Sequence, residues 1–206
     1  MSECVTHILK ARDIDRFITD AHIPEGIAVL DEAVFQDCKN LREVVFPNTV
    51  IRIRQYAFSG CTSLKTITVP ESVENLGAGL FFGCTSLQKI HLPEHINKIG
   101  SRFCYECSSL TDFVMPHVQE IHMEAFAGCQ KLKTCILPEG LMRIGKKAFY
   151  GATELSEVVI PSTVLRIEQD AFLGCNSLKR VTVPMKFQEQ MKDIFGNTDF
   201  EQVIYV

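Results

Sequence analysis

The chain has 206 residues, with 21 Lys and Arg against 25 Asp and Glu, so its net charge is −4. Proteins that bind nucleic acid or anionic membranes normally show a basic excess, and this composition argues against both kinds of partner. Hydrophobic residues make up 46% of the chain, which excludes wholesale disorder, and no apolar run approaches the ~20 residues of a membrane span.

The N-terminal segment MSECVTHILKARDIDRF is interrupted by charged residues throughout. It lacks the unbroken apolar stretch of ~7–15 residues that a secretory signal peptide contains. We therefore expect the chain as given to be cytoplasmic; the alternative is a surface or secreted protein whose signal has been removed. Residues 1–23 are expected to form an N-terminal cap that ends in a first strand near Ile18–Ile23.

The prolines reveal an internal repeat. Successive prolines are 23 residues apart, except for one step of 22, and every proline of the chain lies on this ladder. Apolar residues three and one before each proline alternate with variable residues, which predicts a half-buried strand that ends where proline removes an N–H donor. The ladder consists of Pro24, Pro47, Pro70, Pro93, Pro116, Pro138, Pro161 and Pro184.

The remainder of each repeat follows the proline. A V-x-x-I pair predicts a short extended or turning segment, and x-x-A-F-x-G-C predicts one helical turn that stops at glycine. Twelve residues before the prolines stands an aromatic column, in which Cys104 replaces one ring and Phe103 is shifted by one position. Since a unit of 23 residues is too small to bury its own apolar face, neighbouring units must stack and share a core.

Residues 185–206 change character. KFQEQMKDIF predicts a longer helix that keeps Phe195 in the aromatic register, and a last strand is predicted at Val203–Val206. We therefore expect one domain, with an N-terminal cap over 1–23, repeats over 24–184 and a C-terminal cap over 185–206.

The combined pattern L-x-x-V-x-I/V-P-x-x-V-x-x-I-G-x-x-A-F-x-G-C-x-x-L resembles the BspA-like leucine-rich repeats over residues 24–184. The resemblance implies an α/β repeat solenoid, a right-handed β/α horseshoe with parallel strands on its concave face. In this chain the period predicts about nine such strands. The resemblance also implies a binding or adhesion role, often at cell surfaces.

The nine cysteines are expected to be packed, reduced thiols, because six of them share one column of the repeat and free buried cysteine behaves as a small hydrophobe. The alternative is a zinc or redox site at Cys104 and Cys107. A second alternative is a metal bound by His95, His117 and Glu94. We expect no metal and no cofactor. Since the sequence has no nucleophile elbow, phosphate loop or paired-carboxylate motif, we expect no enzymatic activity.

The outward positions of the predicted strands form the surface of greatest interest. Val114, Ile136 and Val159 are consecutive and apolar there, which is a common mark of partner sites, although β-branched residues also simply favour strands. Extending the register past the last proline adds Tyr205. The predicted function is non-enzymatic protein recognition through the concave face. The predicted contact residues are Lys89, His91, Asp112, Val114, Ile136, Glu157, Val159 and Tyr205.

Two alternatives to this function remain. The uncharged strand Val203–Val206 ends the chain with an open sheet edge, so the protein is alternatively a structural or self-assembling unit that forms a homodimer through this strand. The other alternative is a surface adhesin-type domain without its signal peptide.

Overall fold

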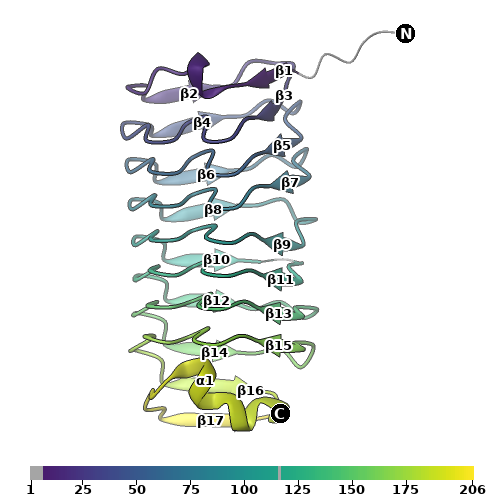
Figure 1. Ribbon diagram of the computed structural model, residues 1–206, viewed down its shortest axis with the longest axis vertical. Helices are drawn as coiled ribbons and strands as arrows, with labels where there is room; N and C mark the ends of the chain where they lie inside the picture. Colours follow the sequence, from purple (N-terminus) through teal and green to yellow (C-terminus); the bar gives the residue numbers. More distant parts are fainter. Residues whose placement is uncertain (1–6, 116) are drawn as a thin grey trace, which may run out of the picture.

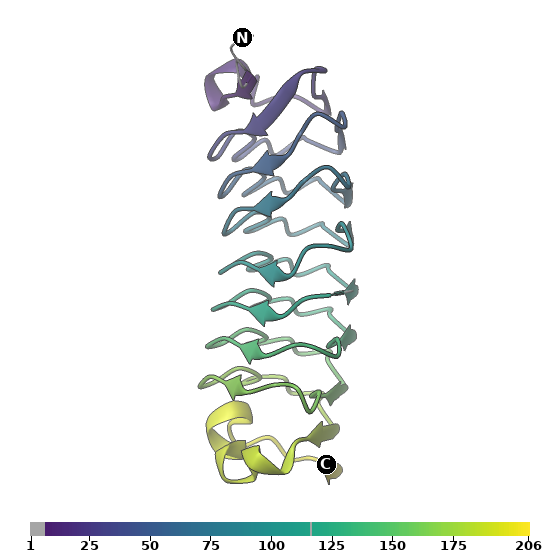
Figure 2. The same ribbon diagram turned by 90° about the vertical axis from the view of Figure 1, so that its right-hand side faces the viewer.

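The computed structural model describes residues 7–115 and 117–206, which wind into a β-solenoid whose coils are stacked along one axis (Figure 1). Most coils contribute one strand of three or four residues to one side of the stack and a shorter strand to another side. Figure 2 shows these two rows of strands running the length of the column, joined by loops. The predicted repeat of 23 residues corresponds to one coil, since Asp20 pairs with Glu43 and Thr66 pairs with Lys89.

The longer strands form a parallel row, called the long-strand face below. In the three-residue strands of this row the middle residue points into the core and the residues on either side point outward, as the alternation predicts. In residues 7–115 and 117–206 this row has nine strands, which confirms the number predicted for the concave face. They are β2 (Asp20–His22), β4 (Glu43–Val45), β6 (Thr66–Thr68), β8 (Lys89–His91), β10 (Asp112–Val114), β12 (Thr134–Ile136), β14 (Glu157–Val159), β16 (Arg180–Val183) and β17 (Gln202–Tyr205).

The V-x-x-I segments form a second parallel row, called the short-strand face below. The isoleucine of the pair points inward, so Ile121 lies beside Ile99 and Ile144 in the core. This row consists of β1 (His7–Leu9), β3 (Ile27–Leu30), β5 (Arg52–Ile53), β7 (Asn75–Leu76), β9 (Lys98–Ile99), β11 (Glu120–Ile121), β13 (Arg143–Ile144) and β15 (Arg166–Ile167).

The helical turn expected around Ala-Phe is replaced by a tight turn. In each regular coil two residues, four apart, have positive φ, and a right-handed helix cannot pass through such residues. Helices are confined to η1 (Ala11–Asp13), η2 (Met185–Gln190) and α1 (Met191–Phe195) within the described residues. The first left-handed position holds Ala33, Tyr56, Gly79, Arg102, Glu124, Lys147 and Asp170. The second holds Asp37, Gly60, Gly83, Glu106, Gly128, Gly151 and Gly174.

Phenylalanine rings fill the middle of the column. From Phe126 to Phe195 successive rings are stacked, with centroids 5.0–5.3 Å apart and interplanar angles of 4–18°. Phe35, Phe58 and Phe81 form a similar stack at the other end. All of these side chains are fully buried or nearly so, which confirms the predicted aromatic column, including Phe195 in the C-terminal cap.

The stack is interrupted in the coil after Pro93. Here Phe103 occupies the position that Ala or an aliphatic residue holds in other coils, and Cys104 occupies the ring position. The hydrogen bonds show this alignment, because Cys104 N–H donates to the Ala125 carbonyl as Phe126 N–H donates to that of Ala148. The Phe103 ring meets Phe81 edge-on, at an interplanar angle of 85°. Phe113, on β10, fills the space next to the small Cys104 and packs against both Phe103 and Phe126.

The C-terminal cap consists of η2, α1 and β17. The longer helix predicted over KFQEQMKDIF is a 3-10 helix that continues into the α-helix, and Ile194 O accepts the N–H of Phe172. The predicted last strand is confirmed as β17, which pairs in parallel with β16. The division of the chain into caps and repeats remains a prediction.

Candidate functional site

The candidate site lies on the long-strand face, across β10, β12 and β14. Val114, Ile136 and Val159 point outward from these strands and are 66%, 70% and 52% exposed. Val114 pairs in register with Ile136, and β14 follows β12 in the next coil, so the three side chains form one continuous apolar row. An exposed row of three large β-branched side chains is unusual on a soluble surface and typical of a contact surface.

A groove runs between β12 and β14. These two strands lie side by side but belong to separate hydrogen-bonded ladders, with β12 paired to β10 and β14 paired to β16. The groove has a volume of about 330 Å³. Ile136 and Val159 line it together with the buried residues Cys135 and Leu137. The lining is therefore mainly apolar at its centre, with Lys133 and Glu157 contributing charges.

Charged residues flank the apolar row within the same strands. Asp112 accepts a hydrogen bond from the Thr134 hydroxyl at 2.8 Å. This bond, a second one from Thr111 and the nearby Lys89 together lower the pKa of Asp112, so it is ionised at neutral pH. Glu157 lies 3.3 Å from the guanidinium of Arg180.

The structure brings seven of the eight predicted contact residues together. Lys89 and His91 are exposed on β8, next to β10, so these seven residues follow one another over four consecutive strands. Their role in binding remains a prediction, but their outward orientation is the one that the alternation predicts.

Tyr205 is the exception, and its predicted orientation is wrong. The last coil is 22 residues long, because Thr182 pairs with Ile204 and Val183 pairs with Tyr205. Tyr205 therefore continues the inward positions and packs against the core, while Ile204, 44% exposed, takes the outward position that the sequence analysis missed. No proline follows Pro184, so the sequence offers no fixed point for counting this register.

The cysteine column has a structural role. Each thiol of the column from Cys61 onward donates a hydrogen bond to a carbonyl of the preceding coil, for example Cys61 Sγ to Phe35 O at 3.1 Å and Cys84 Sγ to Phe58 O at 3.0 Å. Burial raises the pKa of the Cys104 thiol well above its usual range and that of Cys175 to about 12. These two thiols are therefore protonated at neutral pH, and all eight described cysteines are buried. Cys4 lies outside the described residues.

Neither of the proposed metal sites is assembled. In residues 7–115 and 117–206 no three His, Cys, Asp or Glu side chains are grouped as metal binding requires. His95 turns to the preceding coil instead, with Nε2 2.9 Å from Val73 O and Nδ1 3.8 Å from a carboxylate oxygen of Glu71. The part of the chain that the structure describes also has no helix with the length and hydrophobicity needed to cross a membrane.

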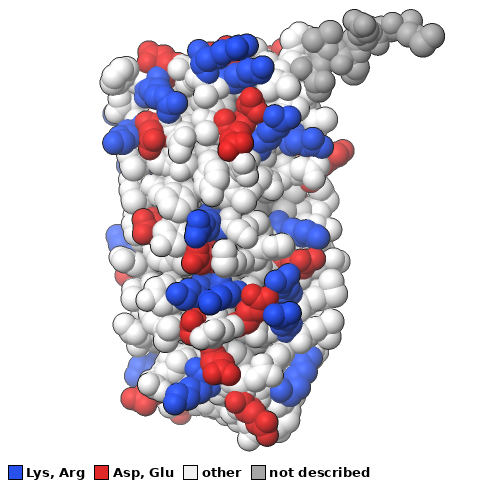
Figure 3. Space-filling view, in the orientation of Figure 1, with Lys and Arg blue, Asp and Glu red and all other residues white. Residues whose placement is uncertain are grey.

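The opposite side of the column is a weaker candidate. Figure 3 shows positive and negative side chains interspersed over the face that carries the short strands. Many of them form ion pairs from coil to coil, such as Arg54 with Asp31 at 2.7 Å and Lys98 with Glu120 at 3.2 Å. The charged groups in these pairs already have partners within the protein and are therefore less suited to bind a charged ligand.

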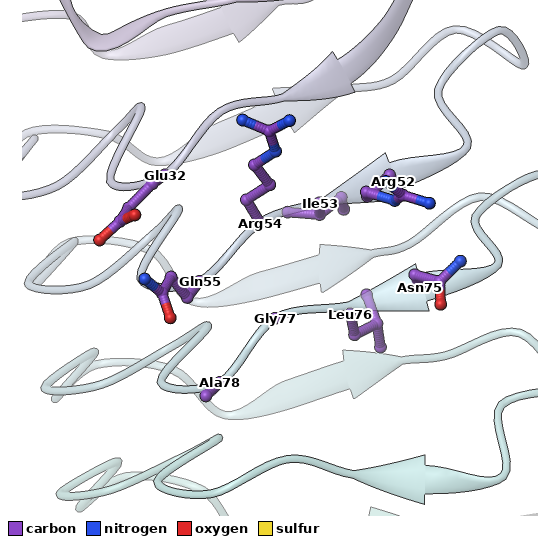
Figure 4. Close-up of a pocket in the computed structure, with 9 residues that line it drawn as sticks. All are labelled: Glu32, Arg52, Ile53, Arg54, Gln55, Asn75, Leu76, Gly77 and Ala78. Carbon is purple, nitrogen blue, oxygen red and sulfur yellow. The ribbon is translucent and has the colours of Figure 1, made fainter.

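A cavity of about 310 Å³ on this side is shown in Figure 4. It lies beside Gly77, where an added Cβ would collide with the backbone of Gln55. The side chains around it do not converge, since Arg54 points to the coil above while Arg52 and Asn75 point away from Glu32. The geometry therefore favours close packing of two backbones and not a ligand site.

The fold and this surface define a leucine-rich-repeat solenoid. The chain belongs to the family of the BspA type leucine rich repeat region, whose model matches residues 15–117 and 98–206. The resemblance predicted from the sequence is thereby confirmed. No curated protein matches the chain.

Solved structures support the same fold. A leucine-rich repeat protein from Eubacterium ventriosum is 28% identical with a TM-score of 0.67, over 78% of this chain and 44% of that one. The pneumococcal vaccine antigen PcpA is 21% identical with a TM-score of 0.54, over 85% of this chain and 53% of that one. This chain thus spans about half the length of these two proteins.

Proposed function

We propose that this protein is a non-enzymatic recognition module that binds another protein through the long-strand face. The observation that carries the proposal is the exposed apolar row of Val114, Ile136 and Val159 beside the groove between β12 and β14. Membership of the leucine-rich-repeat family supports a binding role in general. The partner itself is identified only by chemistry, as a chain that presents an apolar side chain to the groove.

Rigidity of the coil stack favours this use. The row is presented by strands whose inward neighbours, such as Phe113 and Val158, are buried in a continuous core. A surface that is already ordered loses little conformational entropy when a partner docks. Binding energy from a few apolar contacts is then not offset by the cost of ordering the site.

A peptide selection tests the proposal. Random peptides displayed on phage are selected on the wild type and then tested against the double variant Ile136→Glu/Val159→Glu. The control is Val45→Glu/Thr68→Glu, which places the same charges outward on β4 and β6 of the same face. We expect selected peptides to bind wild type and control alike and to lose about tenfold or more in affinity on the double variant.

Two outcomes would overturn the proposal: a selection that yields no binders, or binders that do not distinguish the two double variants. Circular dichroism of each variant confirms that the fold is retained. If Ile136→Glu unfolds the protein, the outward assignment itself is wrong.

A second candidate function is self-association through β17. Among the described strands β17 pairs with β16 alone, and its outward Ile204 is 44% exposed. Unpaired strand edges of this kind pair readily with another copy. Light scattering after size exclusion tests it: a dimer that Ile204→Lys converts to a monomer supports the proposal, and a monomer at all concentrations rejects it.

A further inference from the structure

The tight turns carry an aromatic row that is separate from the buried stack and from the long-strand face. The residue directly after each core ring position belongs to this row. Gly83 N–H donates to Tyr105 O, Glu106 N–H to Ala127 O and Gly128 N–H to Tyr150 O, so successive members lie in successive coils. Four consecutive members of this row are Phe82, Tyr105, Ala127 and Tyr150.

This row has a gap of one ring. Phe82 and Tyr105 are stacked, with centroids 4.9 Å apart and an interplanar angle of 8°. The next coil contributes only Ala127, and the following coil contributes Tyr150, whose side chain is 43% exposed. A cavity of about 360 Å³ occupies this place and is lined by Tyr105, Ala127, Gly128 and Tyr150.

The width of the gap fits a planar group. Tyr105 and Tyr150 are two coils apart, which corresponds to about 10 Å at the ~4.8 Å spacing of neighbouring strands. A flat group halfway between them would face each ring at about 5 Å. This is the separation that Phe82 and Tyr105 already adopt.

A carboxylate borders the same cavity. Glu106 is exposed, and its Cγ lies 3.2 Å from the point where Gly128 would carry a Cβ, so its side chain runs alongside Gly128. Its φ of 59° is left-handed, at a position where Gly60, Gly83 and Gly128 serve other coils. Asp37 adopts the same conformation in its own coil, so the turn of the repeat accepts a carboxylate residue at this position.

We propose that this gap binds the guanidinium group of an arginine side chain from a peptide or protein partner. The guanidinium is planar and stacks on aromatic rings, and its N–H groups are suited to donate to the Glu106 carboxylate. A neutral aromatic ring would also fill the gap, but it would cover the Glu106 carboxylate and offer it no hydrogen-bond donor. This site is independent of the proposed function on the long-strand face.

The surroundings of Tyr150 agree with a cation on this ring. Lys147 Nζ lies 5.3 Å from the centroid of Tyr150. Lys147 itself is not among the residues that line the cavity. The polar lining residues Gln130 and Ser108 add hydrogen-bonding groups and no positive charge.

Titration with short blocked peptides, followed by amide NMR shifts, tests the assignment. The probes are acetyl-Gly-Arg-Gly-amide and the same peptide with citrulline, which is planar but uncharged, or with phenylalanine. We expect the arginine peptide to shift the amides of Ala127, Gly128 and Tyr150 in a saturable way and to bind about tenfold more tightly than the citrulline peptide.

Three variants locate the binding. Ala127→Phe fills the gap and Tyr150→Ala removes one exposed wall, and both should lose about tenfold or more in affinity for the arginine peptide. Tyr56→Ala, which changes an aromatic residue of the turns that does not line the cavity, should bind like the wild type. The proposal is overturned if the arginine peptide causes no saturable shift, if citrulline or phenylalanine binds equally well, or if Ala127→Phe binds normally.

Discussion

The two halves of the aromatic stack show how differently the same core can be built. From Phe126 to Phe195 each coil adds one ring in the same orientation, with interplanar angles of at most 18°. Around Cys104 the rings of Phe103 and Phe113 lie at 54–85° to their neighbours and come from two different positions of the repeat. Yet all of these side chains are buried in one continuous core.

The difference shows that the volume of the core side chains in a coil is kept more strictly than the repeat position from which the aromatic ring comes. Cys104 is smaller than the ring it replaces, and Phe113 is larger than the Val or Ile that most coils carry at its place in the strand. Interiors are packed as densely as organic crystals, so a missing ring must be replaced by atoms from elsewhere. The backbone hydrogen bonds from coil to coil continue unchanged through this exchange.

The largest expected effect is loss of a ring from the regular stack. Phe149 is fully buried between Phe126 and Phe172, with centroids 5.3 and 5.0 Å away. Phe149→Ala should lower the free energy of unfolding by about 3–5 kcal/mol, because the cavity cannot be refilled by rigid neighbours. Urea denaturation measures this, and a loss below about 1 kcal/mol would show that the stack contributes little.

A smaller effect is expected from forcing the irregular coil toward the regular pattern. Cys104→Phe alone adds a ring to a space that Phe113 already fills, and it should destabilise by about 1–3 kcal/mol through overpacking. The triple variant Phe103→Ala/Cys104→Phe/Phe113→Val recreates the regular composition. Its loss should be smaller than the sum of the three single losses, since contacting residues are coupled.

Additive losses in that series would contradict the exchange of volume between these positions. A matched series in the regular coil serves as control. There, Ala171 and Val181 correspond to Phe103 and Phe113. Since Val181 is not enlarged, a second substitution at Val181 should not restore the stability that Ala171→Phe loses.

The thiols should be equally unreactive in both regions. Cys104 and Cys107 of the irregular coil are as fully buried as Cys61 of the regular one. In a Cys4→Ser variant, which removes the one cysteine outside the described residues, we expect a thiol reagent to label none of the remaining eight until denaturant is added. Fast labelling of Cys104 or Cys107 in the native protein would show that the irregular coil opens locally.

Much of this architecture could be predicted from the sequence because each coil repeats its signals at fixed distances. The prolines indicate where the strands end. The alternation before Pro116 and Pro138 predicts that the side chains of Phe113 and Cys135 point inward. Those two rules are sufficient for the long-strand face from β2 to β16. The aromatic column, continued by one more period of 23 residues from Phe172, also places Phe195 in the stack, although its coil differs from the others.

What could not be predicted depends on backbone geometry that the side chains do not reveal. Ala33, Tyr56 and Glu124 adopt positive φ although these residue types rarely do, so the turn was interpreted as helical. The groove beside Ile136 lies between β12 and β14, which are not paired to each other, and alternation carries no information on pairing. Tyr205 was assigned to the wrong side because the last coil is one residue shorter than the period.

The smallest expected effect concerns ion pairs on the short-strand face, one in the regular coils and one beside the irregular coil that contains Cys104. Burial acts to raise the pKa of Glu168, but hydrogen bonds from the Arg143 guanidinium and the Lys146 N–H outweigh it, so its pKa lies below the ordinary value. The hydrogen bond from Lys98 lowers the pKa of Glu120 beside the irregular coil. Both carboxylates therefore stabilise the fold only when ionised.

The sign of the pH dependence follows from these lowered values. The contribution of each carboxylate is complete above the unfolded-state pKa of 4.5 and disappears as the pH falls through the lower folded-state value. At pH 7, Glu168→Gln should cost up to about 1 kcal/mol, and Glu120→Gln less, because Glu168 has two guanidinium partners and a backbone donor. As the pH falls through the folded-state pKa values, both variants should come to match the wild type in urea denaturation. If the cost of Glu168→Gln is the same at pH 7 and at pH 3, the loss comes from packing and not from its charge.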